Sequence, residues 1–267
     1  MSALTPPSSE ASSSSSSPLT APITDEQATS IQSNYLKILS TLPPHVSLVP
    51  VSKTKPASYL LPLLSLPPTT TPNNPGGLVF GENYAQELIS KLELCGTYLP
   101  DSTKFAFIGQ LQSNKINKLI KAGSNGNLVR VETVQKVETV EKLSKAVCSN
   151  WDLEVVKPLE IMVQIDTSGE DSKGGIPYSS ISTIADVVSE VVDKDGLKFV
   201  GLMTIGAPGD VTAFDKLVST RSLLTSHEDT GLSMGMSGDY KEAVEKGSTE
   251  IRCGSNIFGA RDYENKK

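Results

Sequence analysis

The feature that most constrains the fold is a regular alternation of short apolar runs with longer segments of helical spacing. Eight β-prone runs follow one another between residues 46 and 259. In the connecting segments, apolar residues recur every three or four positions, which gives each segment one stripe that can pack on a sheet. Strands that alternate with such segments form parallel βαβ units. The predicted strands are 46–53, 77–83, 104–110, 127–132, 159–166, 197–205, 231–237 and 249–259.

Two architectures satisfy this alternation: an open doubly wound sheet and a closed eight-stranded barrel. The number of strands and the length of 267 residues favour a single (β/α)8 TIM barrel, for which about 250 residues are typical. A first helix is predicted to begin at Thr24 or Asp25 and to stop at the prolines 43 and 44. Stripes of two later helices are formed by Val134, Val137, Val140, Leu143 and Val147, and by Ile181, Ile184, Val188 and Val191.

Two segments do not follow the alternation. Residues 1–23 are rich in serine and proline and almost free of apolar residues, so they are predicted to be a disordered tail that precedes a barrel domain at 24–267. Prolines interrupt the connection 54–79. It is either a short or broken helix followed by an exposed loop, or a second disordered insertion, and the sequence leaves both open.

The composition excludes several classes of function. A net charge of −6 argues against binding of nucleic acids or anionic membranes, which normally requires a basic surplus. No apolar run approaches the roughly 20 residues of a membrane span. The three cysteines and two histidines are scattered, which predicts reduced thiols and no metal site. Without a signal peptide or an arginine-rich presequence, the cytoplasm is the expected location, with a mitochondrial pool left open.

Candidate chemistry begins at the end of the first strand. The active face of such a barrel is built from the carboxyl ends of its strands and the loops that follow. Lys53 lies there, directly after a buried run, and a desolvated lysine amine can attack an aldehyde to form an imine. The alternative is a solvated charge at a strand end. Lys55, two residues further on, is the weaker candidate.

The last two strands add an anion site and a buried cation. Ser237 follows strand seven, and Gly254 and Ser255 follow strand eight, where barrels of this kind frequently bind phosphate. The alternative is that these glycines only permit tight turns. Arg252 lies between apolar neighbours and needs a partner, either a structural carboxylate or the ring nitrogen of a pyridine cofactor. One ligand with an aldehyde, a pyridine ring and a phosphate explains all three features.

The motifs resemble one known family. VSKTKP (51–56), FGENYAQEL (80–88), VQIDTSGEDSKGG (163–175), LSMGMSGDYKEAVEKGSTEIRCG (232–254) and IFGARDY (257–263) are similar to the pyridoxal phosphate homeostasis proteins. The resemblance implies a monomeric barrel like the N-terminal domain of alanine racemase, with pyridoxal 5′-phosphate (PLP) held as a Schiff base. It implies PLP contacts from Lys53 as the Schiff-base lysine, Arg252 at the pyridine nitrogen, Ser237, Gly254 and Ser255 at the phosphate, and Asn83 and Met203 in the pocket wall.

Three functions remain in competition. The first is a non-catalytic protein of vitamin B6 homeostasis that carries PLP, with PLP-requiring apo-enzymes as partners; an arginine at the pyridine nitrogen also disfavours the protonated ring that carbanion chemistry requires. The second is a PLP-dependent amino acid racemase or lyase of narrow scope, with Tyr84, Asp166 or Tyr178 as the additional base. The third is a barrel enzyme for another phosphorylated metabolite.

Overall fold

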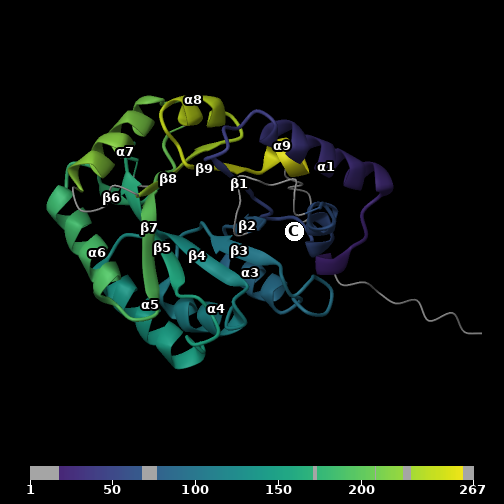
Figure 1. The fold of residues 1–267 in the computed structure, drawn as a ribbon, viewed down its shortest axis with the longest axis horizontal. Coiled ribbons are helices and arrows are strands. Elements are labelled where there is room, and N and C mark those ends of the chain that lie inside the picture. Colours follow the sequence, from purple (N-terminus) through teal and green to yellow (C-terminus); the bar gives the residue numbers. More distant parts are fainter. Residues whose placement is uncertain (1–17, 68–76, 171–172, 208, 225–229, 261–267) are drawn as a thin grey trace, which may run out of the picture.

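The fold is a nearly closed barrel of eight parallel strands surrounded by helices, as predicted (Figure 1). The computed structural model describes residues 18–67, 77–170, 173–207, 209–224 and 230–260. The barrel strands are β1 (Ser47–Pro50), β2 (Val79–Glu82), β3 (Lys104–Phe107), β4 (Leu128–Val134), β5 (Leu159–Asp166), β7 (Leu197–Met203), β8 (Gly231–Met236) and β9 (Glu250–Cys253).

The strands are hydrogen-bonded in the order β1-β9-β8-β7-β5-β4-β3-β2. Between the two ends of this order, β1 and β2, a parallel bridge joins Val51 to Gly81. The amide of Ser52 also donates to the carbonyl of Gly81 at 3.0 Å. The carboxyl ends of all eight strands therefore meet at one end of the barrel, where the predicted site residues lie.

The connecting helices form an outer layer around the strands (Figure 1). The first helix begins as predicted, because Thr24 and Gln27 form a reciprocal capping box. The helices are α1 (Asp25–Leu39), α2 (Leu61–Leu64), α3 (Ala85–Leu92), α4 (Ile116–Ala122), α5 (Val137–Asn150), α6 (Ile181–Asp193), α7 (Thr212–Leu223), α8 (Tyr240–Glu245) and α9 (Ser255–Phe258), with 3-10 turns η1 (Pro18–Thr20), η2 (Ala57–Leu60) and η4 (Ser113–Lys115).

Two details differ from the sequence prediction. Val134 belongs to β4 rather than to the stripe of the following helix, and a two-residue strand β6 (Ile176–Pro177) pairs with the end of β5. Of the predicted tail at residues 1–23, the structure describes residues 18–23, where the carbonyl of Ala21 accepts a hydrogen bond from Ser58 Oγ at 2.5 Å. Residues 1–17 of that tail lie outside the described residues.

The first βα connection contains a broken helix, as one of the two alternatives anticipated. It consists of the 3-10 turn η2 followed by the single turn α2, which has a proline within its first two positions. The loop expected after it falls at 68–76, outside the described residues.

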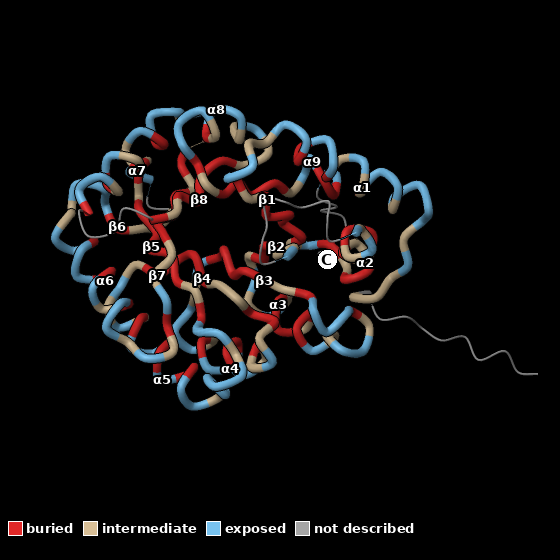
Figure 2. Tube along the Cα trace, viewed as in Figure 1, coloured by how far each residue is buried: buried red, intermediate tan, exposed pale blue. Residues whose placement is uncertain are grey.

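The main apolar core lies between the strands and the helices, where the trace in Figure 2 is buried along the strands and exposed on the outer sides of the helices. The barrel interior is divided instead. A small apolar cluster of Val51, Ala106 and Ile108 fills one part. Charged side chains from β4 and β9 fill another, and these are described below.

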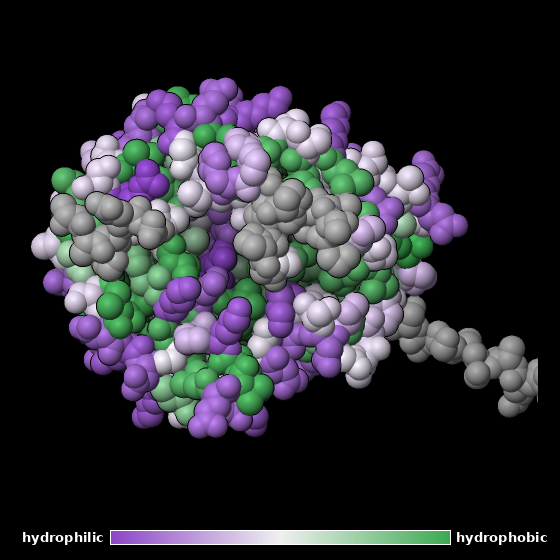
Figure 3. Space-filling model, in the orientation of Figure 1, coloured by the Kyte–Doolittle hydropathy of each residue, from purple (hydrophilic) through white to green (hydrophobic). Residues whose placement is uncertain are grey.

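The outer surface carries polar and apolar side chains side by side on the face seen in Figure 3. In the described part of the chain, no helix combines the length and the apolar character that crossing a membrane requires.

Candidate functional site

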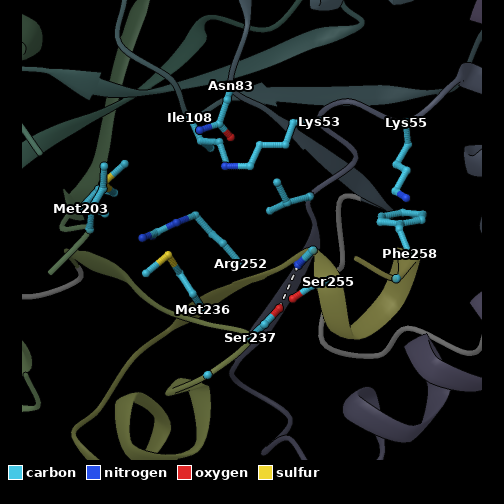
Figure 4. A pocket seen from close by; sticks show the side chains of 15 residues that line it. Lys53, Lys55, Asn83, Ile108, Met203, Met236, Ser237, Arg252, Ser255 and Phe258 are labelled. Carbon is cyan, nitrogen blue, oxygen red and sulfur yellow. Dashed lines mark hydrogen bonds between the residues drawn. The ribbon is translucent and has the colours of Figure 1, made fainter. Parts of the chain in front are cut away.

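All seven predicted site residues line one cavity at the carboxyl end of the barrel (Figure 4). Its volume is about 300 Å³. Each predicted residue lies at the end of a strand or in the loop that follows, which is where barrel sites are built. The lining comprises Val51, Lys53, Lys55, Asn83, Ile108, Met203, Ile205, Met236, Ser237, Gly238, Arg252, Gly254, Ser255, Phe258 and Gly259.

Lys53 is carried by a backbone segment that a buried ion cluster holds in place. The ammonium of Lys91, on α3, donates to the carbonyl of Ser52 at 2.9 Å. It also pairs with Glu82 at 2.5 Å and with Glu87 at 2.9 Å. Lys91 and Glu82 are both fully buried. The Lys91 side chain of α3 thus fixes the backbone immediately before Lys53.

Thr54, the residue after Lys53, is hydrogen-bonded to the same helix, α3. Thr54 has a φ of 65°, in the left-handed region that β-branched residues rarely adopt. Its amide donates to Glu87 Oε1 at 2.8 Å, which compensates part of this strain. Ser52 Oγ donates to Glu82 Oε1 at 2.6 Å. Burial raises the pKa of the Glu82 carboxyl, and the charge of Lys91 acts against this rise.

Asn83 contributes an amide with an unused acceptor. Its Oδ1 is buried and has no hydrogen-bond partner among the described residues. In Figure 4 the Asn83 amide lies beside the Lys53 side chain. A Cβ atom at Gly109 would lie 1.8 Å from the carbonyl oxygen of Asn83, so only glycine permits this close approach. A buried amide of this kind is available to a polar ligand.

Arg252 is buried at the base of the cavity and held by its neighbours. Its Nη1 donates to Ser233 Oγ at 2.5 Å, and its Nη2 donates to the carbonyl of Thr204 at 2.6 Å. Glu132 Oε2 lies 3.9 Å from Nη1. A structural carboxyl group, one of the two partners that the sequence left open, therefore lies near Arg252, and the guanidinium borders the cavity as well.

Ser237 and two backbone amides converge at the other side of the cavity. Ser237 Oγ accepts from the amide of Gly254 at 3.2 Å, drawn as a dashed line in Figure 4, and from that of Asn256 at 3.4 Å. The Asn256 side chain donates to the Ser237 carbonyl at 2.7 Å and ties the two loops together. A hydroxyl and amides gathered in this way suit an anion such as phosphate.

Lys55 and the residues considered as additional bases occupy other positions. Lys55 lines the cavity, but its ammonium donates to the carbonyl of Ala260 at 2.8 Å and lies 5.4 Å from the centre of the Tyr59 ring. Tyr84, Asp166 and Tyr178 are not among the described residues that line the cavity. Asp166 Oδ1 accepts the amides of Ser168 and Gly169 and so stabilises its own loop.

Sequence reasoning missed the residues that support the site from behind. They are Glu82, Glu87 and Lys91 beside Lys53, and Glu132, Ser233 and Thr204 beside Arg252. A signal existed for some of them. Lys91 lies on the apolar face of its helix, and Glu132 lies inside a valine-rich strand, where an unpaired charge is costly.

Comparison with known proteins identifies the family. A family model described as the alanine racemase N-terminal domain matches residues 27–262. The pyridoxal phosphate homeostasis protein of Homo sapiens is 41% identical over 237 residues, covering 82% of this chain and 78% of the human protein. The protein of that name from Vibrio alginolyticus is 35% identical, with 83% and 89% covered.

A solved structure shows the same fold with a ligand. PipY of Synechococcus elongatus PCC7942, with PLP bound, superposes with a TM-score of 0.65 at 27% sequence identity and covers 86% of this chain and 100% of its own. The chain therefore belongs to the alanine racemase N-terminal domain family and, within it, to the pyridoxal phosphate homeostasis proteins.

Proposed function

We propose that the chain binds PLP as a Schiff base on Lys53 and serves intracellular vitamin B6 homeostasis as a carrier without catalytic activity of its own. The observation that carries this proposal is the cavity, which brings together a lysine amine, a buried guanidinium and a serine hydroxyl that accepts hydrogen bonds from two backbone amides. Each suits one part of PLP: its aldehyde, its pyridine ring and its phosphate.

The residues fit the cofactor in size and chemistry. A cavity of about 300 Å³ lies at the lower end of the range for small-molecule sites. Lys53 would hold the aldehyde carbon, Arg252 the ring nitrogen, and Ser237 with the amides of Gly254 and Ser255 the phosphate. The buried Oδ1 of Asn83, which has no hydrogen-bond partner among the described residues, would gain one. PipY, a solved relative with PLP bound, supports PLP as the ligand.

A carrier role is supported over a racemase or lyase by the ionisable groups around the cavity. Among the described residues of its lining these are Lys53, Lys55 and Arg252. Racemisation requires a base on each face of the substrate. Arginine keeps its proton and, with Lys55 bonded to Ala260, Lys53 alone remains for proton transfer. The family model keeps the enzymatic role as the second candidate.

The carrier role includes two further expectations. A monomeric state and transfer of PLP to apo-enzymes follow from the resemblance to the homeostasis proteins. Incubation of the PLP-loaded protein with a PLP-requiring apo-enzyme should restore activity to that enzyme. In gel filtration, the protein should elute at the apparent mass of one protomer.

An absorbance spectrum before and after borohydride, with peptide mapping of the reduced protein, tests the proposal. We expect a visible band after incubation with PLP and a pyridoxyl group fixed on Lys53. Lys53→Arg should lose both, whereas the matched control Lys55→Arg should retain the adduct on Lys53. No band, or an adduct on Lys55, would contradict the assignment. Turnover of any amino acid in a panel, lost in Lys53→Arg, would favour the enzyme instead.

A further inference from the structure

The interior of the barrel contains a row of charged side chains that begins at Arg252. Arg130 and Glu132 come from β4, Ser233 from β8, and Glu250 and Arg252 from β9. Glu132 is fully buried. This row begins at the cavity, where Arg252 lies in Figure 4, and crosses the barrel to Arg130. Arg130 also pairs with Glu160 of β5 at 2.8 Å.

The hydrogen bonds at Ser233 require one more proton than ionised carboxylates provide. Ser233 Oγ lies 2.8 Å from Glu132 Oε2 and 3.0 Å from Glu250 Oε1, and it accepts from Arg252 Nη1. A hydroxyl has a single hydrogen, so it can donate to only one carboxylate. If Glu132 is a carboxylic acid, it donates to Ser233, Ser233 donates to Glu250, and every contact is a hydrogen bond.

The balance of charge supports the same assignment. Two guanidinium groups, Arg130 and Arg252, are shared by three carboxyl groups: Glu132, Glu250 and the partly exposed Glu160. An ionised Glu132 would add an excess negative charge inside the barrel, which is costly in a buried site. Its Oε1 has no hydrogen-bond partner among the described residues and lies 3.8 Å from Arg130 Nη1.

The proton belongs to Glu132 rather than to Glu250. Burial and the charge of Glu250 raise the pKa of Glu132 to about 8, although Arg252 and Arg130 act to lower it. Burial also acts to raise the pKa of Glu250, but the charge of Arg130 and its hydrogen bond to Glu250 outweigh this and keep that pKa below its ordinary value.

We propose that Glu132 is a buried carboxylic acid that positions Arg252 through Ser233 and makes ligand binding in the cavity sensitive to pH. The ligand part of this inference rests on the proposed function. When Glu132 ionises, its negative charge draws the Arg252 guanidinium toward the barrel interior and offsets its charge. An anionic ligand such as PLP is then held less tightly, so binding should weaken as the pH rises.

The first arm of the test uses the protein without ligand. In the infrared difference spectrum of wild type minus Glu132→Gln, the C=O stretch of a protonated carboxylic acid should be present near neutral pH and fade at alkaline pH. The difference removes any band from Glu82, whose pKa is also raised by burial. Absence of this band from the difference spectrum overturns the inference whatever the protein binds.

The second arm measures PLP binding by the absorbance of the bound form. From about pH 7 to about pH 9, wild-type affinity should fall roughly fivefold relative to Glu132→Gln, because glutamine retains the donor to Ser233 and cannot ionise. Ser233→Ala, which keeps the carboxyl and its 3.9 Å contact with Arg252 but removes the hydrogen-bonded link, should reduce this pH response while retaining the infrared band. An equal response in the wild type and Glu132→Gln overturns the coupling. Absence of bound PLP from all variants would refute the proposed function, with the infrared arm still deciding the protonation.

Discussion

Lys91 illustrates how single residues prepare this site. A fully buried ammonium is unfavourable unless its charge and its three donors are satisfied, and Lys91 meets Glu82, Glu87 and the carbonyl of Ser52. These contacts fix the backbone that presents Lys53. The lysine that is expected to react with the cofactor therefore depends on a second lysine that never reaches the cavity.

Replacing Lys91 by methionine should lower the free energy of unfolding by roughly 3–5 kcal/mol, because it leaves Glu82 buried without its counter-charge. Urea unfolding of the ligand-free protein measures this loss. The control is Lys104→Met, which removes a single hydrogen bond from Nζ to the carbonyl of Gly126 and should cost about 1 kcal/mol. Similar losses for both variants would show that the cluster gives no special support.

Some of these residues could be identified from the sequence and others could not. Arg252 was recognisable because a charge inside an apolar strand must have a partner. Its actual neighbours were not, since Thr204, directly after β7, and Glu132, on β4, are far away in the sequence. Which residues face each other across a barrel depends on the stagger of all its strands, which periodicity in one strand does not reveal.

Among the elements, β8 shows how a local irregularity shapes the site. Its pairing with β9 changes register between Ser233 and Met236. Gly235, within this stretch, has a φ of 95°, and a Cβ there would lie 2.5 Å from the Cβ of Ala243. The irregularity lets Ser233 contact Arg252 in the interior while Met236 and Ser237 line the cavity.

Gly235→Ala should therefore destabilise the protein by about 1–3 kcal/mol, through backbone strain and the clash with α8. It should also weaken PLP binding, because Ser237 follows the displaced segment. Denaturant unfolding and PLP titration measure the two effects. Gly238→Ala, where an added Cβ meets nothing within 4 Å, is the control for stability. Unchanged stability of Gly235→Ala would show that β8 tolerates a regular backbone.

The strands and helices themselves were largely predictable. All eight barrel strands lie within or close to their expected ranges because buried parallel strands are continuous apolar runs. β6 was missed because two residues give no periodic signal. Val134 was assigned to a helix because a buried residue at the end of β4 continues the spacing of the next stripe by coincidence.

At the scale of the whole molecule, closure of the barrel creates an interior that an open sheet would not have. It brings β4 opposite β8 and β9, so that Glu132 and Glu250 share Ser233. Beside the small apolar cluster of Val51, Ala106 and Ile108, charged side chains occupy part of an interior that bulky aliphatic residues fill in typical barrels of this kind. The row of charged side chains from Arg252 to Arg130 therefore couples the site to the stability of the entire fold.

Glu132→Gln should consequently change how stability depends on pH. The pKa of Glu132 is about 8 in the folded protein and 4.5 ordinarily, so between these values the folded state keeps a proton that the unfolded state has released. The stability that Glu132 contributes is therefore complete below pH 4.5 and is lost as the pH rises toward 8. Glutamine does not titrate, so the unfolding free energy of Glu132→Gln should rise relative to that of the wild type by on the order of a few kcal/mol across this window.

Urea unfolding of the ligand-free proteins at about pH 5, about pH 7 and about pH 9 measures this relative rise. The control is Glu138→Gln, which removes the carboxyl of an exposed glutamate on α5. A difference between Glu132→Gln and the wild type that stays constant with pH would mean that the carboxyl behind Arg252 is ionised throughout.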